Sequence, residues 1–427
     1  MMMPDGTPSA SPGTLMAASP VAEPTLFVTE EPFLPPGNGS MQVYHSVAAE
    51  HRAIGCATFC VSFFKDGDAA RSPATAAAYS AHFDGHLMLP GWNGGGGLAG
   101  KAALAVREAN RWMTGNVFAG HPFIHTARNG IARSVAATIR SWGVRRIYCH
   151  KVNALQLFLP VLRHLDGIPV TLDLHDDFVR KAADYDTAYA RLFRELPLRE
   201  IARNHAQAWL RHRFSRANEA KSRTAELGYL SLCDRVIIAS GSEAALYASF
   251  PQLSGKVVHR PWGYARPPAA RARTGGKAAF DIGFIGSSDV MNLDAVAHLR
   301  DDILPELRIR RPGTRVLLAG TLAGKVGHLV AGLPDVVVRP RTEQVEDFYR
   351  DVAVPVVPLR HGTGVSIKVL EALAFGKAIV STPIGVRGLP PEALNGISVA
   401  ASPAAFAAAV DRALTTQDAA TRPLQEV

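Results

Sequence analysis

The sequence is short of cysteine and of long apolar runs. Its 427 residues include four cysteines, which show neither a close metal-ligand spacing nor the density of a disulfide-stabilised protein. No apolar run reaches the roughly 20 residues that a membrane-spanning helix needs. Residues 1–24 lack a basic start and a continuous apolar core, so they predict a disordered tail and not a signal peptide. We therefore expect a cytoplasmic protein with reduced cysteines, namely Cys56, Cys60, Cys149 and Cys233.

The sequence also lacks the modules that read nucleic acid. It carries 46 Lys and Arg against 37 Asp and Glu, and the net charge of +9 indicates an anionic partner: a phosphate-bearing small molecule, an acidic membrane surface or nucleic acid. No zinc finger, aromatic RNA-binding signature or basic zipper accompanies this charge, so nucleic acid is not expected. The first predicted strand–helix turn lacks the glycine spacing of dinucleotide-binding folds, which argues against an oxidoreductase.

What the sequence does contain is an alternation of predicted strands and helices. A composition of 47% hydrophobic and 19% charged residues is typical of globular proteins, and the length suits two domains. We predict a first domain over residues 25–266, a second over 279–427, and between them a linker at 267–278 that is rich in Pro, Gly, Ala and Arg. The expected fold is α/β, with two Rossmann-like, doubly wound domains that face each other across a cleft.

Two stretches of the first domain lie where such folds bind ligands. The loop Gly37-Asn38-Gly39-Ser40 follows the strand predicted at 25–29, and His175-Asp176-Asp177 follows the strand predicted at 169–174. Ligands bind outside the carboxyl ends of parallel strands, so both stretches are candidate site segments. The alternatives are a plain loop at 37–40, a structural histidine at 175, and a helix cap at Asp176 or Asp177.

Residues 362–383 combine a glycine-spaced loop, a short helix and an apolar strand. Gly362 and Gly364 permit the backbone to approach a ligand closely, and Thr363 or Ser366 can cap the helix that follows. The unpaired N–H groups at the start of that helix favour an anion by roughly 0.3–1 kcal/mol when they are exposed. This loop is therefore a candidate phosphate site.

Lys368 and Glu371 lie on the helix that follows this loop, three residues apart and so on one helix face. The lysine suits a phosphate, and the carboxylate suits a pair of sugar hydroxyls. The alternative is that the two residues form an ordinary ion pair on the surface of an amphipathic helix.

Four segments of the second domain follow one another in a distinctive order. They are Phe284-Ile285-Gly286-Ser287, Leu318-Ala319-Gly320, Pro358-Leu359-Arg360-His361-Gly362-Thr363-Gly364 and Lys368-Val369-Leu370-Glu371-Ala372-Leu373-Ala374-Phe375-Gly376-Lys377. In order and spacing they resemble the carboxyl-terminal domain of the glycosyltransferase family 4 (group 1) enzymes. More loosely, the loop at 37–40 and His175-Asp176 look like that family's acceptor-side loop and its strand-end histidine.

The resemblance implies a GT-B architecture and a retaining transfer of a sugar from a nucleotide-sugar donor to a hydroxyl acceptor, which would be a glycan, a lipid-linked glycan or a small molecule. Glu371 matches the acid that holds the donor ribose, and the helix start near Gly364 matches the pyrophosphate site. The leaving phosphate itself would take the acceptor proton, so no protein base and no metal or other cofactor is expected. The implied donor-binding residues are Gly286, Ser287, Arg360, Gly362, Thr363, Gly364, Lys368 and Glu371.

The sequence departs from the family pattern at two places. Thr363 stands where the family has an acid that contacts the donor sugar, and residues 286–289 lack the family's basic pair. We expect Lys368 to supply the missing phosphate charge, with Arg360 as a second candidate, and so name His175 and Lys368 as the catalytic candidates.

Other functions of the same fold stay open. A sugar-nucleotide epimerase would convert the donor without an acceptor, and a non-catalytic protein would only bind a sugar nucleotide or a glycan. Acceptor choice is expected in variable loops such as Trp92–Gly97. Seven Lys or Arg residues between Arg199 and Arg223 predict a peripheral contact with an anionic inner membrane surface, or else a solvated helix that packs on its own domain.

Overall fold

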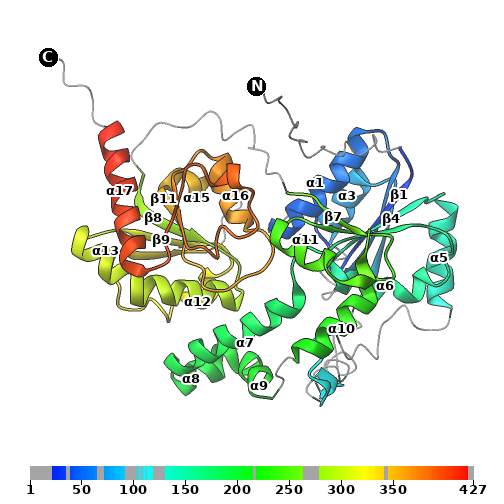
Figure 1. The fold of residues 1–427 in the computed structure, drawn as a ribbon, viewed down its shortest axis with the longest axis horizontal. Coiled ribbons are helices and arrows are strands. Elements are labelled where there is room, and N and C mark those ends of the chain that lie inside the picture. Colours follow the sequence, from blue (N-terminus) through cyan, green and yellow to red (C-terminus); the bar gives the residue numbers. More distant parts are fainter. Residues whose placement is uncertain are drawn as a thin grey trace, which may run out of the picture.

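The computed structural model shows two α/β bodies side by side, each built on one parallel β-sheet (Figure 1). It describes residues 22–34, 39–64, 72–91, 102, 105–106, 109–111, 113–118, 130–214, 218–262, 278–340 and 345–421. Gly37, Asn38, the Trp92–Gly97 loop, and most of the predicted tail and linker lie outside these ranges.

The first body contains a seven-stranded sheet in the order β3-β2-β1-β4-β5-β6-β7, in which every neighbouring pair is parallel. The central strand β1 is buried along its whole length, as expected for a parallel sheet with helices on both faces. The strands are β1 (Thr25–Thr29), β2 (Thr58–Phe64), β3 (Gly85–Pro90), β4 (Arg146–His150), β5 (Val170–Asp173), β6 (Arg235–Ile238) and β7 (Val257–His259). The helices are α1 (Gly39–Ala53), α3 (Pro73–His82), α5 (Ile131–Ser141), α6 (Lys151–Leu162), α7 (Phe178–Glu195), α8 (Leu198–Glu200), α9 (Ala206–Phe214), α10 (Glu219–Leu230) and α11 (Gly241–Ala248).

The second body contains a six-stranded sheet in the order β10-β9-β8-β11-β12-β13, again parallel throughout. Its strands are β8 (Phe280–Ile285), β9 (Val316–Ala319), β10 (Val336–Arg339), β11 (Val352–Val357), β12 (Ile379–Ser381) and β13 (Ile397–Val399). Its helices are α12 (Val290–His298), α13 (Leu304–Arg310), α14 (Ala323–Val326), α15 (Val345–Asp351), α16 (Ile367–Ala374) and α17 (Pro403–Thr421).

In both sheets the strand order reverses between two neighbours, β1 and β4 in the first sheet and β8 and β11 in the second. Such a reversal opens a crevice outside the carboxyl ends of the strands, where ligands bind in doubly wound folds. The predicted fold class, α/β with two Rossmann-like doubly wound domains, is confirmed. The exact domain boundaries stay a prediction.

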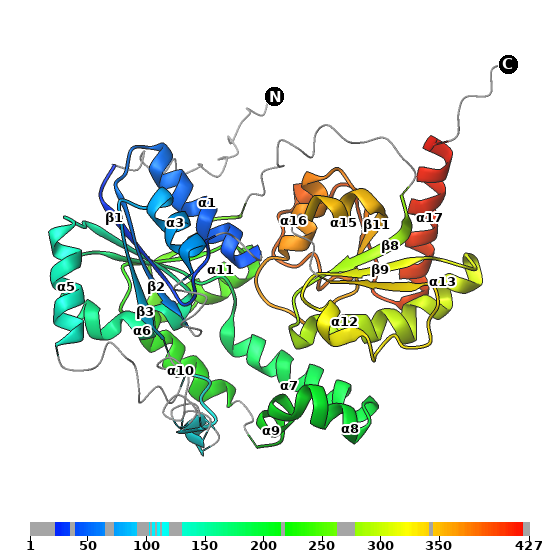
Figure 2. The same ribbon diagram turned by 180° about the vertical axis from the view of Figure 1, so that it is seen from behind.

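Helix α7 connects the two bodies, because it follows β5 of the first sheet but packs on α12 of the second (Figures 1 and 2). Three buried residues of α7 or its carboxyl end, Ala188, Leu192 and Leu196, belong to the core of the second body. Burial of each of the two leucines contributes about 1.5–3 kcal/mol to the free energy of unfolding. The contact therefore helps to hold the two bodies together.

The basic region from Arg199 to Arg223 is not one long helix. It consists of α8, a π-helical stretch at Ile201–His205, α9 and the first part of α10. Ile201 is buried in the core of the second body and Trp209 packs against that core. Arg223, at the other end of the region, pairs with Asp177 of the first body at 2.7 Å. The region therefore contacts both domains. Within the described ranges, no helix combines the length and the apolar character needed to cross a membrane. Contact of the basic region with a membrane surface stays a prediction.

Candidate functional site

The glycine loop before α16 lies directly against the first domain. The Thr363 hydroxyl donates a hydrogen bond of 3.0 Å to Asp176 Oδ1, and the Gly362 N–H donates one of 3.0 Å to Asp184 Oδ2. The Gly364 N–H donates a third, of 2.7 Å, to Glu243 Oε1. The loop predicted to hold a phosphate thus faces three carboxylates of the other domain, which come from the β5–α7 connection, α7 and α11.

The close contact between this loop and the first domain requires a glycine at position 364. Its φ of 69° is in the left-handed region, which favours glycine. A Cβ atom at this position would lie 2.4 Å from the His175 carbonyl oxygen and 2.9 Å from Asp176 Oδ1. The amino end of α1 is similarly close, since a Cβ on Gly39 would lie 2.8 Å from the Ile367 side chain. The described part of the predicted acceptor-side loop, Gly39 and Ser40, therefore reaches the start of α16.

His175 sits at the end of β5 with a φ of 61°, a conformation that costs a non-glycine residue about 1–3 kcal/mol. Its Nε2 atom lies 3.1 Å from His150 Nδ1 and 3.7 Å from Asp173 Oδ1. Burial holds the pKa of the His175 imidazole well below its usual range, and the charge of Lys151 lowers it further. The ring is therefore neutral at physiological pH and suits hydrogen bonding more than charge stabilisation.

The two aspartates after His175 have different partners. Asp177 caps α7 by accepting a hydrogen bond of 3.0 Å from the Arg180 N–H, and it pairs with Arg223 at 2.7 Å. Asp176 does not cap the helix; it pairs with Lys181 at 2.8 Å and faces Thr363. Burial raises the pKa of the Asp176 carboxyl, but the Lys181 charge outweighs it and holds the pKa below the usual range. Asp176 is therefore a carboxylate at the domain interface.

Lys368 and Glu371 do not pair with each other among the described ion pairs. The Lys368 ammonium donates a hydrogen bond of 3.1 Å to Asn292 Oδ1 and lies 5.3 Å from the centre of the Phe284 ring. Glu371 Oε2 accepts a hydrogen bond of 3.2 Å from the Tyr349 hydroxyl. Burial lowers the pKa of Lys368 to about 8 and raises that of Glu371 to about 7. Each charge is thus held in a poorly solvated place by a neutral partner, which leaves both able to bind a ligand.

The β8–α12 loop is connected to Lys368 through Asn292. Asn292 Nδ2 donates a hydrogen bond of 3.0 Å to Ser287 Oγ, while its Oδ1 accepts from Lys368. Gly286 lies against the same amide, because a Cβ there would be 3.0 Å from Asn292 Cγ. The structure thus brings the predicted donor residues Gly286, Ser287 and Lys368 together.

Arg360 is engaged elsewhere. Its guanidinium bonds both carboxylate oxygens of Asp294, at 3.0 and 2.7 Å, and Asp302 at 3.3 Å. These two acids offset its positive charge, and its role toward a donor stays a prediction. At the start of α16, Ser366 occupies the N-cap position without a side-chain cap bond, and Thr363 bonds Asp176 instead.

Four residues of this interface are not apparent from the sequence: Asp184, Glu243, Asn292 and Arg387. Arg387 bonds the Gly362 carbonyl oxygen and lies 4.0 Å from Glu243. Burial raises the pKa of Glu243 to about 7. One signal was present, because Glu243 is the third residue after Ser240, whose hydroxyl caps α11, a spacing typical of helix starts at strand ends.

One buried group, His150, Asp173 and His175, has the donor atoms of a metal site, all within 4.8 Å of one another. Lys151 is a close cationic neighbour, and its charge lowers the pKa of both histidines. Lys151 is itself paired with Glu30 at 2.9 Å, and the two histidines contact each other at 3.1 Å through His150 Nδ1 and His175 Nε2. The expectation that no metal is required stays a prediction.

The chain resembles known proteins both in sequence and in fold. The second domain matches the family model of the glycosyl transferases group 1 over residues 279–416. The matched segment is about a third of the chain and contains Lys368, Glu371 and the glycine loop. No curated protein matches the whole sequence.

Solved structures resemble the chain over nearly its whole length. Sucrose-phosphate synthase from Thermosynechococcus elongatus has a TM-score of 0.57 at 15% identity, covering 92% of this chain and 90% of that one. An α,α-trehalose-phosphate synthase from Burkholderia vietnamiensis scores 0.53 at 14% identity, covering 94% and 92%. Anabaena HepE in complex with UDP and glucose scores 0.54 at 12% identity, covering 93% and 92%. These likenesses establish the GT-B fold, and with the family match they support a group 1 glycosyltransferase.

Proposed function

We propose that the protein is a retaining glycosyltransferase of family 4 that moves a sugar from a nucleotide-sugar donor to a hydroxyl group of an acceptor. The observation that carries the proposal is the buried pair Lys368 and Glu371, each held by a neutral partner, within the segment that matches the group 1 model. The complexes of HepE with UDP and with UDP-glucose support a nucleotide sugar as the donor.

In this proposal the donor lies on the second domain. Glu371 accepts hydrogen bonds from two ribose hydroxyls, and Lys368 lies beside the diphosphate. Cleavage of the sugar–phosphate bond places negative charge on the leaving diphosphate, and a positioned cation stabilises that charge more in the transition state than in the ground state. Ser287 and Asn292 hold the lysine in place through their hydrogen bonds. No metal takes part, so activity should survive EDTA.

Asp176 can replace the acid that the family pattern has at the position of Thr363. Thr363 stands at the position of that acid, and the Asp176 carboxylate lies 3.0 Å from its hydroxyl. We infer that the first domain supplies the carboxylate that reaches the donor sugar. The neutral His175 ring, next to Asp176, would bond a sugar hydroxyl, and Gly39 and Ser40 would lie on the acceptor side.

The test is product analysis. The protein is incubated with a panel of nucleotide sugars, with and without mixed glycan, lipid-linked and small-molecule acceptors. Mass spectrometry gives the masses of the products, and NMR distinguishes their epimers and anomers. We expect an acceptor heavier by one sugar, with retained anomeric configuration. An epimerised nucleotide sugar formed without acceptor would indicate an epimerase, and binding without any product would indicate a binding protein. Either outcome would contradict the proposal.

A further inference from the structure

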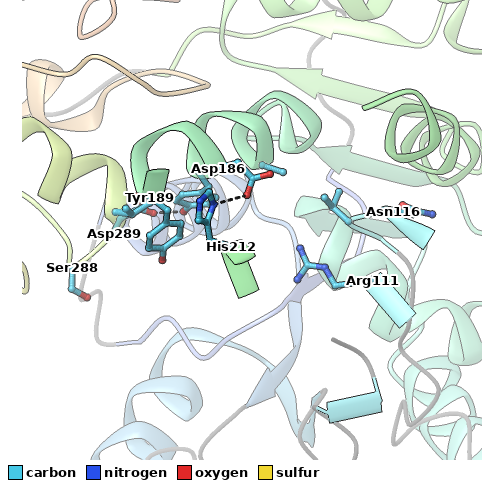
Figure 3. Close-up of a pocket in the computed structure, with 12 residues that line it drawn as sticks. Arg111, Asn116, Asp186, Tyr189, His212, Ser288 and Asp289 are labelled. Carbon is cyan, nitrogen blue, oxygen red and sulfur yellow. Dashed lines mark hydrogen bonds and ion pairs between the residues drawn. The ribbon is translucent and has the colours of Figure 1, made fainter. Parts of the chain in front are cut away.

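A cavity of about 240 Å³ lies between the two domains, beside the donor residues but separate from Glu371. Helix α7 contributes Tyr185, Asp186 and Tyr189, and α9 contributes His212. Arg111 and residues 115–117 lie on another side, and Ser288 to Val290 at the start of α12 close the cavity toward the second domain. In Figure 3, Arg111 points toward Tyr189 and His212 from the facing segment.

The cavity lies next to the loop that we propose binds the donor. Ser288 and Asp289 line it, and they directly follow Gly286 and Ser287 in the β8–α12 loop. The Asp289 charge also acts on Lys368, whose pKa it raises against the effect of burial. A molecule in the cavity would therefore lie next to the proposed diphosphate site, where an acceptor must stand.

The walls of the cavity combine aromatic rings with groups that bond hydroxyls. The rings of Tyr185 and Tyr189 are 6.4 Å apart, and Tyr189 is also 6.4 Å from the His212 ring. Rings of this kind pack against the C–H faces of a sugar. Asp186, which lies 3.9 Å from His212, together with the Arg111 guanidinium supplies acceptors and donors for sugar hydroxyls.

The volume and the charged groups of the cavity limit the class of ligand that it can bind. Sites for drug-sized ligands measure about 300–1,000 Å³, so a cavity of about 240 Å³ suits a single sugar ring. Two carboxylates, Asp186 and Asp289, face one guanidinium, that of Arg111. Lys368 and Lys181 also act on Asp289 from outside the lining. Among the residues that line the cavity, however, carboxylates outnumber guanidinium groups, which favours a neutral sugar over a phosphate dianion.

We propose that this cavity binds the neutral sugar ring of the acceptor, an inference that rests on the proposed glycosyl transfer. In the transfer, the acceptor hydroxyl oxygen forms a bond to the anomeric carbon of the donor, the bond from that carbon to the phosphate oxygen breaks, and the hydroxyl proton passes to the leaving diphosphate.

The experiment measures binding and transfer separately. Saturation-transfer NMR on the full chain tests the methyl glycosides of glucose, galactose, mannose and N-acetylglucosamine, with glucose 6-phosphate as the anionic comparison. The variants are Tyr189→Ala and Asp186→Asn. The matched control is Asp166→Asn, because Asp166 is exposed and lies outside the cavity.

We expect at least one neutral glycoside to bind more tightly than glucose 6-phosphate. Loss of a ring contact or a hydrogen bond should weaken its binding about fivefold to tenfold in Tyr189→Ala and in Asp186→Asn, while Asp166→Asn and wild type agree. Affinity for the nucleotide sugar should change less than twofold in all three variants. Absence of binding by all four glycosides, unchanged binding in both cavity variants, or tighter binding of glucose 6-phosphate would overturn the inference. A failure of donor binding in wild type would instead contradict the proposed function.

Discussion

The Thr363 hydroxyl donates a hydrogen bond of 3.0 Å to the Asp176 carboxylate, across the interface between the two domains. The two residues are 187 positions apart in the chain. The bond places a carboxylate of the first domain beside the position at which related enzymes carry an acid on the second. In the function that we propose, the site is therefore completed only when the domains are together.

Asp176→Asn should lower transfer about 100-fold, because it removes the carboxylate that we place at the donor sugar while keeping the side-chain shape. Thr363→Glu alone should also impair transfer, since it adds a second negative charge next to Asp176. Combining the two substitutions should recover part of the activity, because one carboxylate is again present. Steady-state kinetics measures this cycle, and equal activity of Asp176→Asn and wild type would contradict it.

Lys368→Ala should reduce turnover of the donor by about 100- to 1,000-fold, the usual loss when a group that stabilises a developing charge is removed. The fold should stay intact, as checked by circular dichroism. Lys221→Ala serves as the control, since Lys221 is exposed on α10 and far from α16 in the sequence. Turnover near that of wild type would refute the role of Lys368.

Donor affinity should be highest between about pH 7 and pH 8. Lys368 must be protonated to bind the diphosphate, so affinity falls as pH rises above its pKa of about 8. Glu371 must be ionised to accept the ribose hydroxyls, so affinity also falls as pH drops below its pKa of about 7. Isothermal titration across this range measures the profile, and Lys368→Ala should abolish the alkaline limb. A profile without an alkaline limb in wild type would disprove the assignment.

Glu371→Gln should flatten the pH dependence of stability. The pKa of Glu371 is raised on folding from 4.5 to about 7, so the folded state binds the proton more strongly. The stability from this group is fully present below pH 4.5 and is lost as pH rises through about 7. The loss amounts to about 3 kcal/mol. Thermal unfolding at several pH values should show a steeper fall for wild type than for Glu371→Gln, and parallel curves would contradict the buried position.

Gly364→Ala should keep the domains apart, because its methyl group would meet the His175 carbonyl oxygen. Gly376→Ala is the matched control: its φ of 66° imposes the same backbone strain, but the space around it is open. Small-angle X-ray scattering should give a larger radius of gyration for Gly364→Ala alone, with transfer lost. Equal radii and equal activities in the two variants would contradict the closed arrangement.

The sequence predicts the fold class and the local geometry of α16 well, because both depend on nearby residues. Strand and helix alternation determines the parallel sheets, and the spacing of Lys368 and Glu371 places them on one helix face. The sequence does not predict the partners of these residues, because they are distant along the chain. Asn292 lies 76 positions from Lys368, and Glu243 lies 121 positions from Gly364. Which acids meet the glycine loop depends on how the two domains pack, including α7 on α12, and no local pattern encodes that packing.

We propose that Lys368 and Glu371 together hold a nucleotide sugar, and a thermal-shift measurement detects that binding. Wild type and the double variant Lys368→Ala, Glu371→Gln are each heated with a panel of nucleotide sugars. We expect at least one compound to raise the melting temperature of wild type and none to raise that of the double variant. Equal stabilisation of the two proteins, or no stabilisation of wild type by any nucleotide sugar, would contradict it.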